Sequence, residues 1–148
     1  MKVAEVMRTN VLSVSAETPL RKINELLHRF GLSYIIITEQ GSVRSIIAYA
    51  DLFRQILPSY DEFMRDESYW LTPETMEQRV SALINRPVSD VMSHPVITVP
   101  PEMEAVRAGG LMIAKKVKQL PVVKDGQLVG VVSFTDITWG FLMRPLFG

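Results

Sequence analysis

Residues 119–139 read QLPVVKDGQLVGVVSFTDITW, two short apolar runs separated by Lys-Asp-Gly-Gln and followed directly by a helical stretch. Asp-Gly between valine-rich runs favours the tight type I′ turn of a β-hairpin. The segment therefore predicts two antiparallel strands that end at a strand-to-helix corner. Ser133, Thr135 and Asp136 occupy that corner.

The polar residues of the corner admit two interpretations. The first turn of a helix has unpaired N–H groups and a partial positive charge, so that a phosphate or a ribose can bind there. Alternatively, Ser133 and Asp136 have the spacing of a capping box, with Asp in place of Glu, and act only on their own helix. These residues alone leave both interpretations open.

The composition indicates a globular protein with a sizeable core. Of the 148 residues 47% are hydrophobic, and 16 basic residues balance 16 acidic ones. Without a basic cluster, nucleic-acid binding is not expected. No apolar run reaches the ~20 residues of a transmembrane helix, and the first residues lack the apolar core of a signal peptide, so we expect no membrane association. The absence of cysteine fits the cytoplasm, the expected location.

Neither metal chemistry nor catalysis is expected. The two histidines, His28 and His94, have no His, Asp or Glu at metal-ligand spacing on a shared face. No nucleophile can be paired with a base from the sequence, so we expect that the protein is not an enzyme.

The first third of the chain predicts the order β-α-β-β-α. Thr18-Pro19 has the pattern of an N-cap and a first helical residue, and Gly31 that of a residue that ends a helix. The expected elements are a strand at 11–14, a helix at 19–30, strands at 34–38 and 43–48, and a helix from 51 onward.

The same order returns 85 positions later. Residues 3–53 align with residues 88–138 without a gap, and the turn glycines, the opening Val-x-x-Val-Met segments and the corner aspartates coincide. Such coincidence indicates an internal duplication. The identical pairs are Val3/Val88, Val6/Val91, Met7/Met92, Val11/Val96, Val14/Val99, Glu17/Glu102, Leu26/Leu111, Gly41/Gly126 and Asp51/Asp136.

The duplication bears on the capping question. In the first copy Asp51 is retained, but the residue three positions earlier is Ala48, a poor N-cap. An aspartate without its capping partner favours a role beyond capping and makes the two interpretations about equal.

Two further stretches have open explanations. Between the copies, residues 58–86 predict two short amphipathic helices that start at Ser59 and Thr72 and either cover the pair or dock a partner. In the helix predicted over 102–117, Gly109-Gly110 indicates the close approach of a neighbouring helix or of a ligand.

These features together resemble a tandem pair of cystathionine-β-synthase (CBS) domains, the Bateman module. The most specific motifs are Val91-Met92, Pro95-Val-Ile-Thr-Val99, Leu120-Pro-Val-Val123 and Gly130-Val-Val-Ser-Phe-Thr-Asp-Ile137. The resemblance implies an α/β (α+β) fold of two β-α-β-β-α repeats about a pseudo-twofold axis. The expected bounds are repeat 1 at 1–57, a helical linker at 58–86 and repeat 2 at 87–148.

The resemblance also implies ligand roles for residues of the second copy. In such domains Asp136 binds the ribose hydroxyls, Ser133 the ribose or phosphate, and Lys118 the phosphates. The remaining candidates are Thr135 and Gly130 of the same motif and, around the adenine, Val96, Pro121 and Val132. The first copy has Ser45, Ala48, Ser33 and Ile36 at the positions of Gly130, Ser133, Lys118 and Pro121, so Asp51 implies at most a weak site.

The function that the resemblance implies is a non-enzymatic sensor that binds AMP, ADP, ATP or S-adenosylmethionine in a cleft between the repeats. No cofactor is required, because the adenine nucleotide is a regulatory ligand. The expected partners are a second copy of the chain, through apolar residues near its end (Phe141, Leu142, Met143, Leu146 and Phe147), and a separately encoded regulated protein. The alternative is an interaction or dimerisation scaffold whose degenerate pocket binds nothing.

Overall fold

The structure is a computed structural model that describes residues 1–70, 72–92 and 96–147. Both helices and strands are present along the chain, as expected for the α+β class. Contacts divide the chain into two compact units, each assembled from segments that are distant in sequence. Unit 1 comprises Met1–Ser13, Thr38–Arg44 and Pro95–Gly148, and unit 2 comprises Val14–Ile37 and Ser45–His94.

Unit 1 is built on the predicted hairpin. Strands β4 (Gln119–Lys124) and β5 (Gln127–Ser133) pair antiparallel around Asp125 and Gly126. The φ angles of these turn residues, 52° and 77°, are both positive, as a type I′ turn requires. The hairpin prediction is therefore confirmed.

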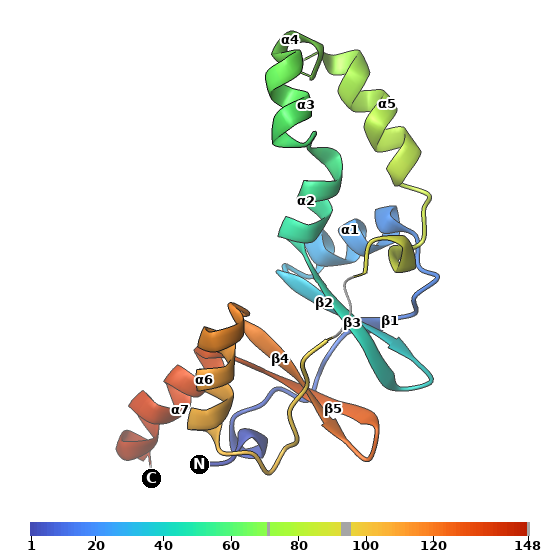
Figure 1. Cartoon of the computed structure of the whole chain (residues 1–148). Coiled ribbons are helices and arrows are strands. Elements are labelled where there is room, and N and C mark those ends of the chain that lie inside the picture. Colours follow the sequence, from blue (N-terminus) through green and yellow to red (C-terminus); the bar gives the residue numbers. More distant parts are fainter. Residues whose placement is uncertain (71, 93–95, 148) are drawn as a thin grey trace. The chain divides into compact units, whose positions relative to one another are not determined.

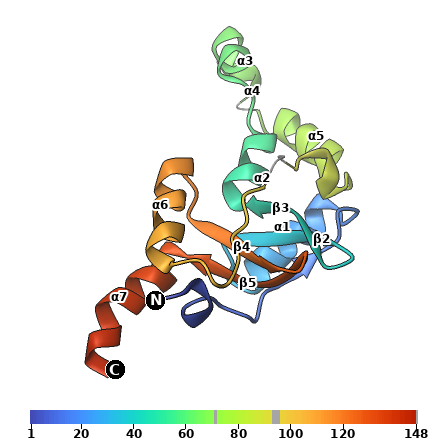
Figure 2. The ribbon, with the colours of Figure 1, turned by 60° about the horizontal axis from the view of Figure 1, so that its bottom comes forward.

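Two helices accompany the hairpin in both views (Figures 1 and 2): α6 (Ala105–Lys115) and α7 (Phe134–Phe147). The helix predicted over 102–117 is shorter than expected. The carbonyl of Met103 accepts from the amide of Val3, and the amide of Ala105 donates to the carbonyl of Met1, both at 2.8 Å. Because these bonds hold the preceding residues outside a helix, α6 begins only at Ala105.

The N-terminal segment, residues 1–13, is part of unit 1. It contains the 3₁₀ turn η1 (Val3–Glu5). Farther along, Arg8 and Val131 exchange two backbone hydrogen bonds of 2.8 and 2.9 Å, which add this segment to the edge of β5. The opening segment of the first repeat is thus built into the unit that holds the second repeat's hairpin. The sequence repeat and the compact unit therefore have different bounds.

A continuous apolar core holds unit 1 together. Strands, both helices and the N-terminal segment all contribute to it, so that the segment is fixed by burial as well as by hydrogen bonds. Its buried members are Val3, Val99, Ala105, Ala108, Met112, Leu120, Val122, Val132 and Ile137.

Unit 2 contains most of the first repeat and the stretch between the repeats. A three-stranded sheet has the order β1-β2-β3, and the turn between β2 and β3 is grouped with unit 1. The elements are β1 (Ser13–Val14), α1 (Leu20–Arg29), β2 (Tyr34–Glu39), β3 (Ser42–Ala48), α2 (Tyr49–Ile56), α3 (Tyr60–Arg65), α4 (Glu67–Trp70), α5 (Pro73–Leu83) and η2 (Val88–Asp90).

Helix α1 begins one residue later than predicted, with Pro19 and not Thr18 at the N-cap. The amides of Leu20 and Arg21 donate to backbone carbonyls of residues 86 and 84, at 2.9 and 3.0 Å. A distant segment thus satisfies the helix terminus, and the side chain of Thr18 is not needed as a cap. Gly31, with φ of 62°, follows the helix as predicted.

The described residues of the stretch between the repeats, 58–70 and 72–86, form three helices, α3, α4 and α5, instead of the two predicted. The extra break falls at Asp66, whose Oδ1 atom accepts hydrogen bonds from the hydroxyl of Ser68 and the amide of Tyr69. These bonds cap a new helix within the expected one. The predicted start at Ser59 is confirmed, because its hydroxyl accepts from the amide of Glu62 at 3.2 Å. In Figure 2, α3 and α4 project beyond α2 and α5.

Candidate functional site

Asp136 lies in the first turn of α7 and is buried, with 8% of its surface exposed. Its Oδ2 atom accepts hydrogen bonds from both the amide and the hydroxyl of Ser133, each at 2.9 Å. In return, the hydroxyl of Ser133 accepts from the amide of Asp136 at 3.2 Å. The reciprocal bonds of a capping box are therefore present at this corner.

The other carboxylate oxygen of Asp136 meets a cation from the opposite end of the sequence. Nε of Arg8 donates to Oδ1 at 2.9 Å, while the arginine side chain is 69% exposed. Sequence reasoning missed Arg8 because its counterpart in the second copy is Ser93, so that the repeat gives no signal there. Only the pairing of residue 8 with residue 131 brings it to the corner.

The backbone amides at the start of α7 are largely occupied. The amide of Phe134 donates to the carbonyl of Lys118 at 3.1 Å, and those of Ser133 and Asp136 bond to each other's side chains. The expectation that unpaired amides receive a phosphate is therefore wrong for these three groups. Side chains must supply most of the positive charge for an anion at this corner.

Two further predicted site residues lie at the same corner. Lys118 immediately precedes β4, and because its carbonyl bonds to Phe134 it sits beside the start of α7 with its side chain exposed. Thr135 is also exposed, in the first turn of the helix. The structure thus gathers a carboxylate, two hydroxyls and two cations at one end of the hairpin.

Gly130 has a packing role in the structure. A Cβ atom added to it would lie 2.7 Å from the carbonyl oxygen of Arg8 and 2.9 Å from Sδ of Met7. Real Cβ atoms do not approach backbone oxygens so closely, so only glycine lets the N-terminal segment lie against β5. The glycine thereby allows Arg8 to reach the corner.

The three residues expected around an adenine differ in accessibility. Val132 is fully buried in the core, Pro121 is buried, and Val96 is half-buried. Val99 bonds to β4 on the edge opposite the N-terminal segment, with its amide donating to the carbonyl of Pro121 at 3.1 Å. The hairpin therefore has a backbone neighbour on each side. His94 and Pro95 lie outside the described residues.

Asp51 is placed in unit 2, at the start of α2. Its Oδ2 atom accepts from the amide of Ala48 at 2.8 Å, and its Oδ1 atom accepts from Arg54 at 2.6 Å. The inference that Asp51 lacks a capping partner is therefore wrong, because the group it caps is a backbone amide, which alanine has as well. Retention of an aspartate at both corners does not by itself indicate a ligand.

Gly109 and Gly110 of α6 have different surroundings. A Cβ atom on Gly109 would lie 3.8 Å from the side chain of Ile137, in ordinary contact with α7, whereas one on Gly110 would meet nothing within 4 Å. Helix α7 is thus the neighbour of Gly109, but it lies far enough away that an alanine would also fit there.

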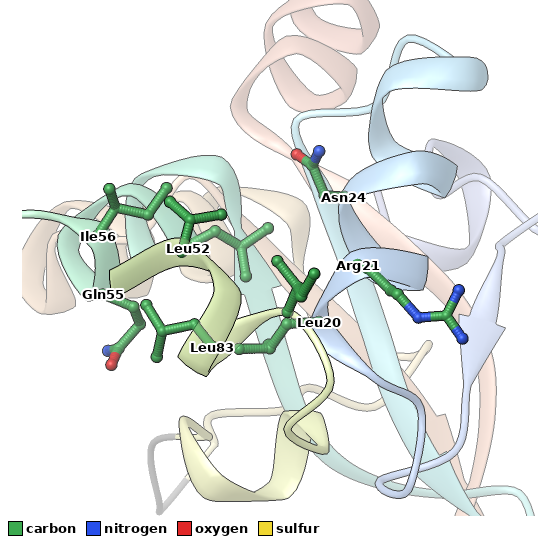
Figure 3. Close-up of a pocket in the computed structure, with 9 residues that line it drawn as sticks. Leu20, Arg21, Asn24, Leu52, Gln55, Ile56 and Leu83 are labelled. Atoms are coloured by element: carbon green, nitrogen blue, oxygen red, sulfur yellow. The ribbon is translucent and has the colours of Figure 1, made fainter. Parts of the chain in front are cut away.

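A separate apolar pocket of about 210 Å³ lies in unit 2, between α1, α2 and α5. Figure 3 shows Leu20, Leu52 and Leu83 converging on it, whereas the guanidinium of Arg21 points away. Its lining is almost entirely hydrocarbon and offers a ligand little charge.

The described residues contain neither a candidate metal site nor a candidate membrane-spanning helix. No group of three or more His, Asp or Glu side chains there could hold a metal ion. Over the same residues, no helix is both long and apolar enough to cross a lipid bilayer.

Comparisons with known proteins agree with the architecture. The CBS domain family matches the chain twice, at residues 3–58 and 88–140. The protein MK0525 of Methanopyrus kandleri is 30% identical over 139 residues, which are 93% of this chain and 61% of that protein. The chain therefore spans less than two thirds of this relative.

Solved structures show the same fold. CBSX2, crystallised in complex with AMP, has a TM-score of 0.74 at 20% identity, covering 97% of this chain and 98% of that one. The CBS domain pair of MJ0100, in complex with 5′-methylthioadenosine and S-adenosyl-L-methionine, has a TM-score of 0.70 at 15% identity, covering 97% and 98%. The two matched regions account for most of the sequence, and the chain belongs to the CBS domain family.

Proposed function

We propose that the chain is a non-enzymatic regulatory module that binds an adenosine-containing ligand at the corner formed by Lys118, Ser133, Thr135 and Asp136. The observation that carries the proposal is the orientation of the Asp136 carboxylate. Its Oδ2 atom is held by two hydrogen bonds from Ser133, which leaves Oδ1 on the side of the exposed Arg8 and available to further donors.

A carboxylate held in this way suits a ribose. Each carboxylate oxygen has two lone pairs, so that Oδ1 of Asp136 can accept from a sugar hydroxyl in addition to Arg8. Since the cap already fixes the side chain, little conformational entropy is lost on binding. Lys118 then supplies positive charge to a phosphate or another anionic group.

Two similar proteins support the choice of ligand class. CBSX2 was crystallised with AMP, and MJ0100 with 5′-methylthioadenosine and S-adenosyl-L-methionine. All three compounds contain adenosine, so the shared chemistry is an adenine base with its ribose. The first corner, with Ala48 and Ser33 in place of Ser133 and Lys118, supports at most weak binding.

As a regulatory module, the protein would act through the different affinity of two conformations for the ligand. The output passes to a partner protein or to a second copy of the chain. Exposed apolar side chains on α7 favour self-association: Trp139 is 62% and Leu142 68% exposed. The side chains of Leu146 and Phe147, also expected in this surface, lie outside those described.

An interaction scaffold without a ligand is the second candidate. It is favoured by the capping geometry, which accounts for both corner aspartates without any nucleotide. It is also favoured by the exposed apolar side chains, which include Ile113 of α6 at 72% exposure. The two functions differ in one measurable property, the affinity for adenosine compounds.

The test is a calorimetric titration of the full chain with AMP, ADP, ATP and S-adenosylmethionine. Asp136→Ala should abolish binding, whereas Asp51→Ala, which removes the same cap from the other corner, should leave most of it. Saturation at ~100 times the dissociation constant should raise the free energy of unfolding by roughly 2.7 kcal/mol. Absence of binding by the wild-type chain would refute the proposal and leave the scaffold.

A further inference from the structure

We infer that Arg8 determines specificity at this site by selecting adenosine ligands with an anionic group next to the ribose over the uncharged nucleoside. The inference rests on the proposed function, because it assigns a further residue to the same site. It concerns a residue of the N-terminal segment, outside the motif that Ser133 and Asp136 form.

The first support is the fixed position of the Arg8 backbone. Two hydrogen bonds to Val131, of 2.8 and 2.9 Å, make residue 8 part of the sheet, and Gly130 provides the space for this contact. The backbone is therefore anchored, whereas the side chain is 69% exposed and reaches over the corner. A ligand at Oδ1 of Asp136 necessarily lies beside the guanidinium.

The second support is that most of the identified backbone donors at the corner are already bonded. In many nucleotide sites helix amides bind the phosphate. Here the amides of Ser133, Phe134 and Asp136 are bonded within the corner. The exposed side chains of Arg8 and Lys118 can therefore supply charged donors to a phosphate or carboxylate at this corner.

The third support is the shape of the guanidinium. It has five N–H donors in a planar fork, so it can bond to a carboxylate and to a second anion together. Nε of Arg8 donates to Oδ1 of Asp136. A ligand that places an anion beside its ribose therefore gains a charged hydrogen bond, whereas adenosine only shares Oδ1 with the arginine. Arg8 thus adds affinity for the charged ligand alone.

The experiment compares adenosine with AMP by calorimetry on the full chain. The wild type should bind AMP more tightly, and Arg8→Gln should lower the ratio of AMP to adenosine affinity about tenfold, the lower end of the range for a charged hydrogen bond. The affinity for adenosine should stay the same or rise slightly. Arg8→Lys, which keeps the charge but not the fork, should give an intermediate ratio.

Arg144→Gln is the matched control. Arg144 lies eight residues beyond Asp136 on α7 and forms an exposed ion pair with Glu5 at 2.9 Å, so this variant removes the same charge from the same unit. It should leave the affinity ratio unchanged. Higher salt should weaken AMP binding more in the wild type than in Arg8→Gln. Salt screens the attraction between charges, and the variant has already lost the attraction that Arg8 contributes.

Three outcomes would overturn the inference, and only one of them affects the proposed function. An unchanged ratio in Arg8→Gln means that the arginine does not select anions. An equal loss of affinity for AMP and adenosine means that Arg8 only positions Asp136 or stabilises the unit. Thermal unfolding of the variant would detect such a loss of stability. If the wild type binds neither compound, the proposed function fails first.

Discussion

The two strand-to-helix corners perform the same local task. Oδ2 of Asp51 accepts from the amide of Ala48 at 2.8 Å, and Oδ2 of Asp136 accepts from the amide of Ser133 at 2.9 Å. In each case the second oxygen bonds to an arginine. The aspartate common to both repeats therefore reflects a common way to end a strand and begin a helix.

The corners differ in where the arginine comes from. Arg54 is three residues beyond Asp51 on the same helix, whereas Arg8 is 128 residues away from Asp136 in sequence. The side chain of Asp51 is 33% exposed, that of Asp136 only 8%. The difference shows that the features which could make a binding site are those the repeats do not share: a capping hydroxyl, a lysine and a distant arginine.

The largest loss of stability is expected when Gly130 of β5 is replaced by the residue at the equivalent position of the first repeat. Ser45 occupies the equivalent position in β3 and is buried there. In β5, Gly130→Ser should force the carbonyl of Arg8 and the side chain of Met7 away, because both lie within 3 Å of the new Cβ atom. We expect a loss of about 2–3 kcal/mol in the free energy of unfolding, measured by denaturant titration.

Gly110→Ala is the control for this substitution. Gly110 lies within α6, and an added Cβ atom would meet nothing within 4 Å. The change should therefore stabilise the chain by up to about 1 kcal/mol, the difference in helix propensity. Equal effects of the two substitutions would contradict the explanation of Gly130 by close packing.

The second largest loss of stability is expected from replacing Asp136, and replacing Asp51 provides the comparison. Asp136→Ala removes a buried carboxylate that bonds to the amide and hydroxyl of Ser133 and to Arg8. It should lower the free energy of unfolding by about 2 kcal/mol. Asp51→Ala removes a partly exposed cap and should cost about 1 kcal/mol. Both are measured as shifts in the denaturant midpoint. A larger loss for Asp51→Ala would show that burial is not what separates the corners.

Local patterns in the sequence predicted much of the fold. The hairpin follows from Asp125-Gly126, because the type I′ turn that this pair favours needs two positive φ angles in succession, and both residues have them. Helix α1 was less well predicted at its start, where carbonyls of residues 84 and 86 replace the side chain of Thr18. A helix terminus that a distant segment satisfies has no local signal.

The site was also predictable only where its residues are close together in the sequence. Ser133 and Asp136 belong to one motif, and the start of a helix follows from it. Arg8 enters through a bond between residues 8 and 131, which no spacing along the chain reveals. The occupied amides of α7 were equally hidden, because the acceptor of the Phe134 amide is the carbonyl of Lys118, before the other strand of the hairpin.

A third, smaller effect should follow from giving the first corner its missing hydroxyl. Ala48 has the extended backbone of an N-cap, with φ of −107° and ψ of 164°. In Ala48→Ser the hydroxyl can accept from the amide of Asp51, as that of Ser133 does from Asp136. We expect a gain of about 0.5–1 kcal/mol in the free energy of unfolding.

Nucleotide binding should not change in the same variant, because the first corner still lacks the lysine and the distant arginine. Ser133→Ala is the converse control and should lose about 1 kcal/mol. If Ala48→Ser instead created a second binding event in calorimetry, the capping hydroxyl alone would be sufficient for a site, and the importance assigned to Arg8 and Lys118 would be wrong.

The smallest effect concerns the anchor of the segment that carries Arg8. The pKa of the Glu104 carboxyl lies below its ordinary value of 4.5, because the Lys2 side chain and the N-terminal ammonium donate hydrogen bonds to it. A carboxyl with a lowered pKa in the folded state stabilises the fold above its unfolded pKa, and this contribution is lost as the pH falls through the folded value. Both Glu104 and Lys2 are exposed, so the contribution is small and screened by salt.

We therefore expect the free energies of unfolding of the wild type and of Glu104→Gln to differ by a constant amount above about pH 5 and to converge on further acidification. At neutral pH, hydrogen exchange of the Arg8 amide should be faster in the variant, because the anchor of its segment is weakened. Exchange of the Arg54 amide should be unaffected, because Arg54 lies on the same helix as its partner Asp51 and does not depend on the N-terminal segment. Equal acceleration at both amides would mean that the variant loosens the whole chain, and that the second corner does not depend specifically on its N-terminal segment.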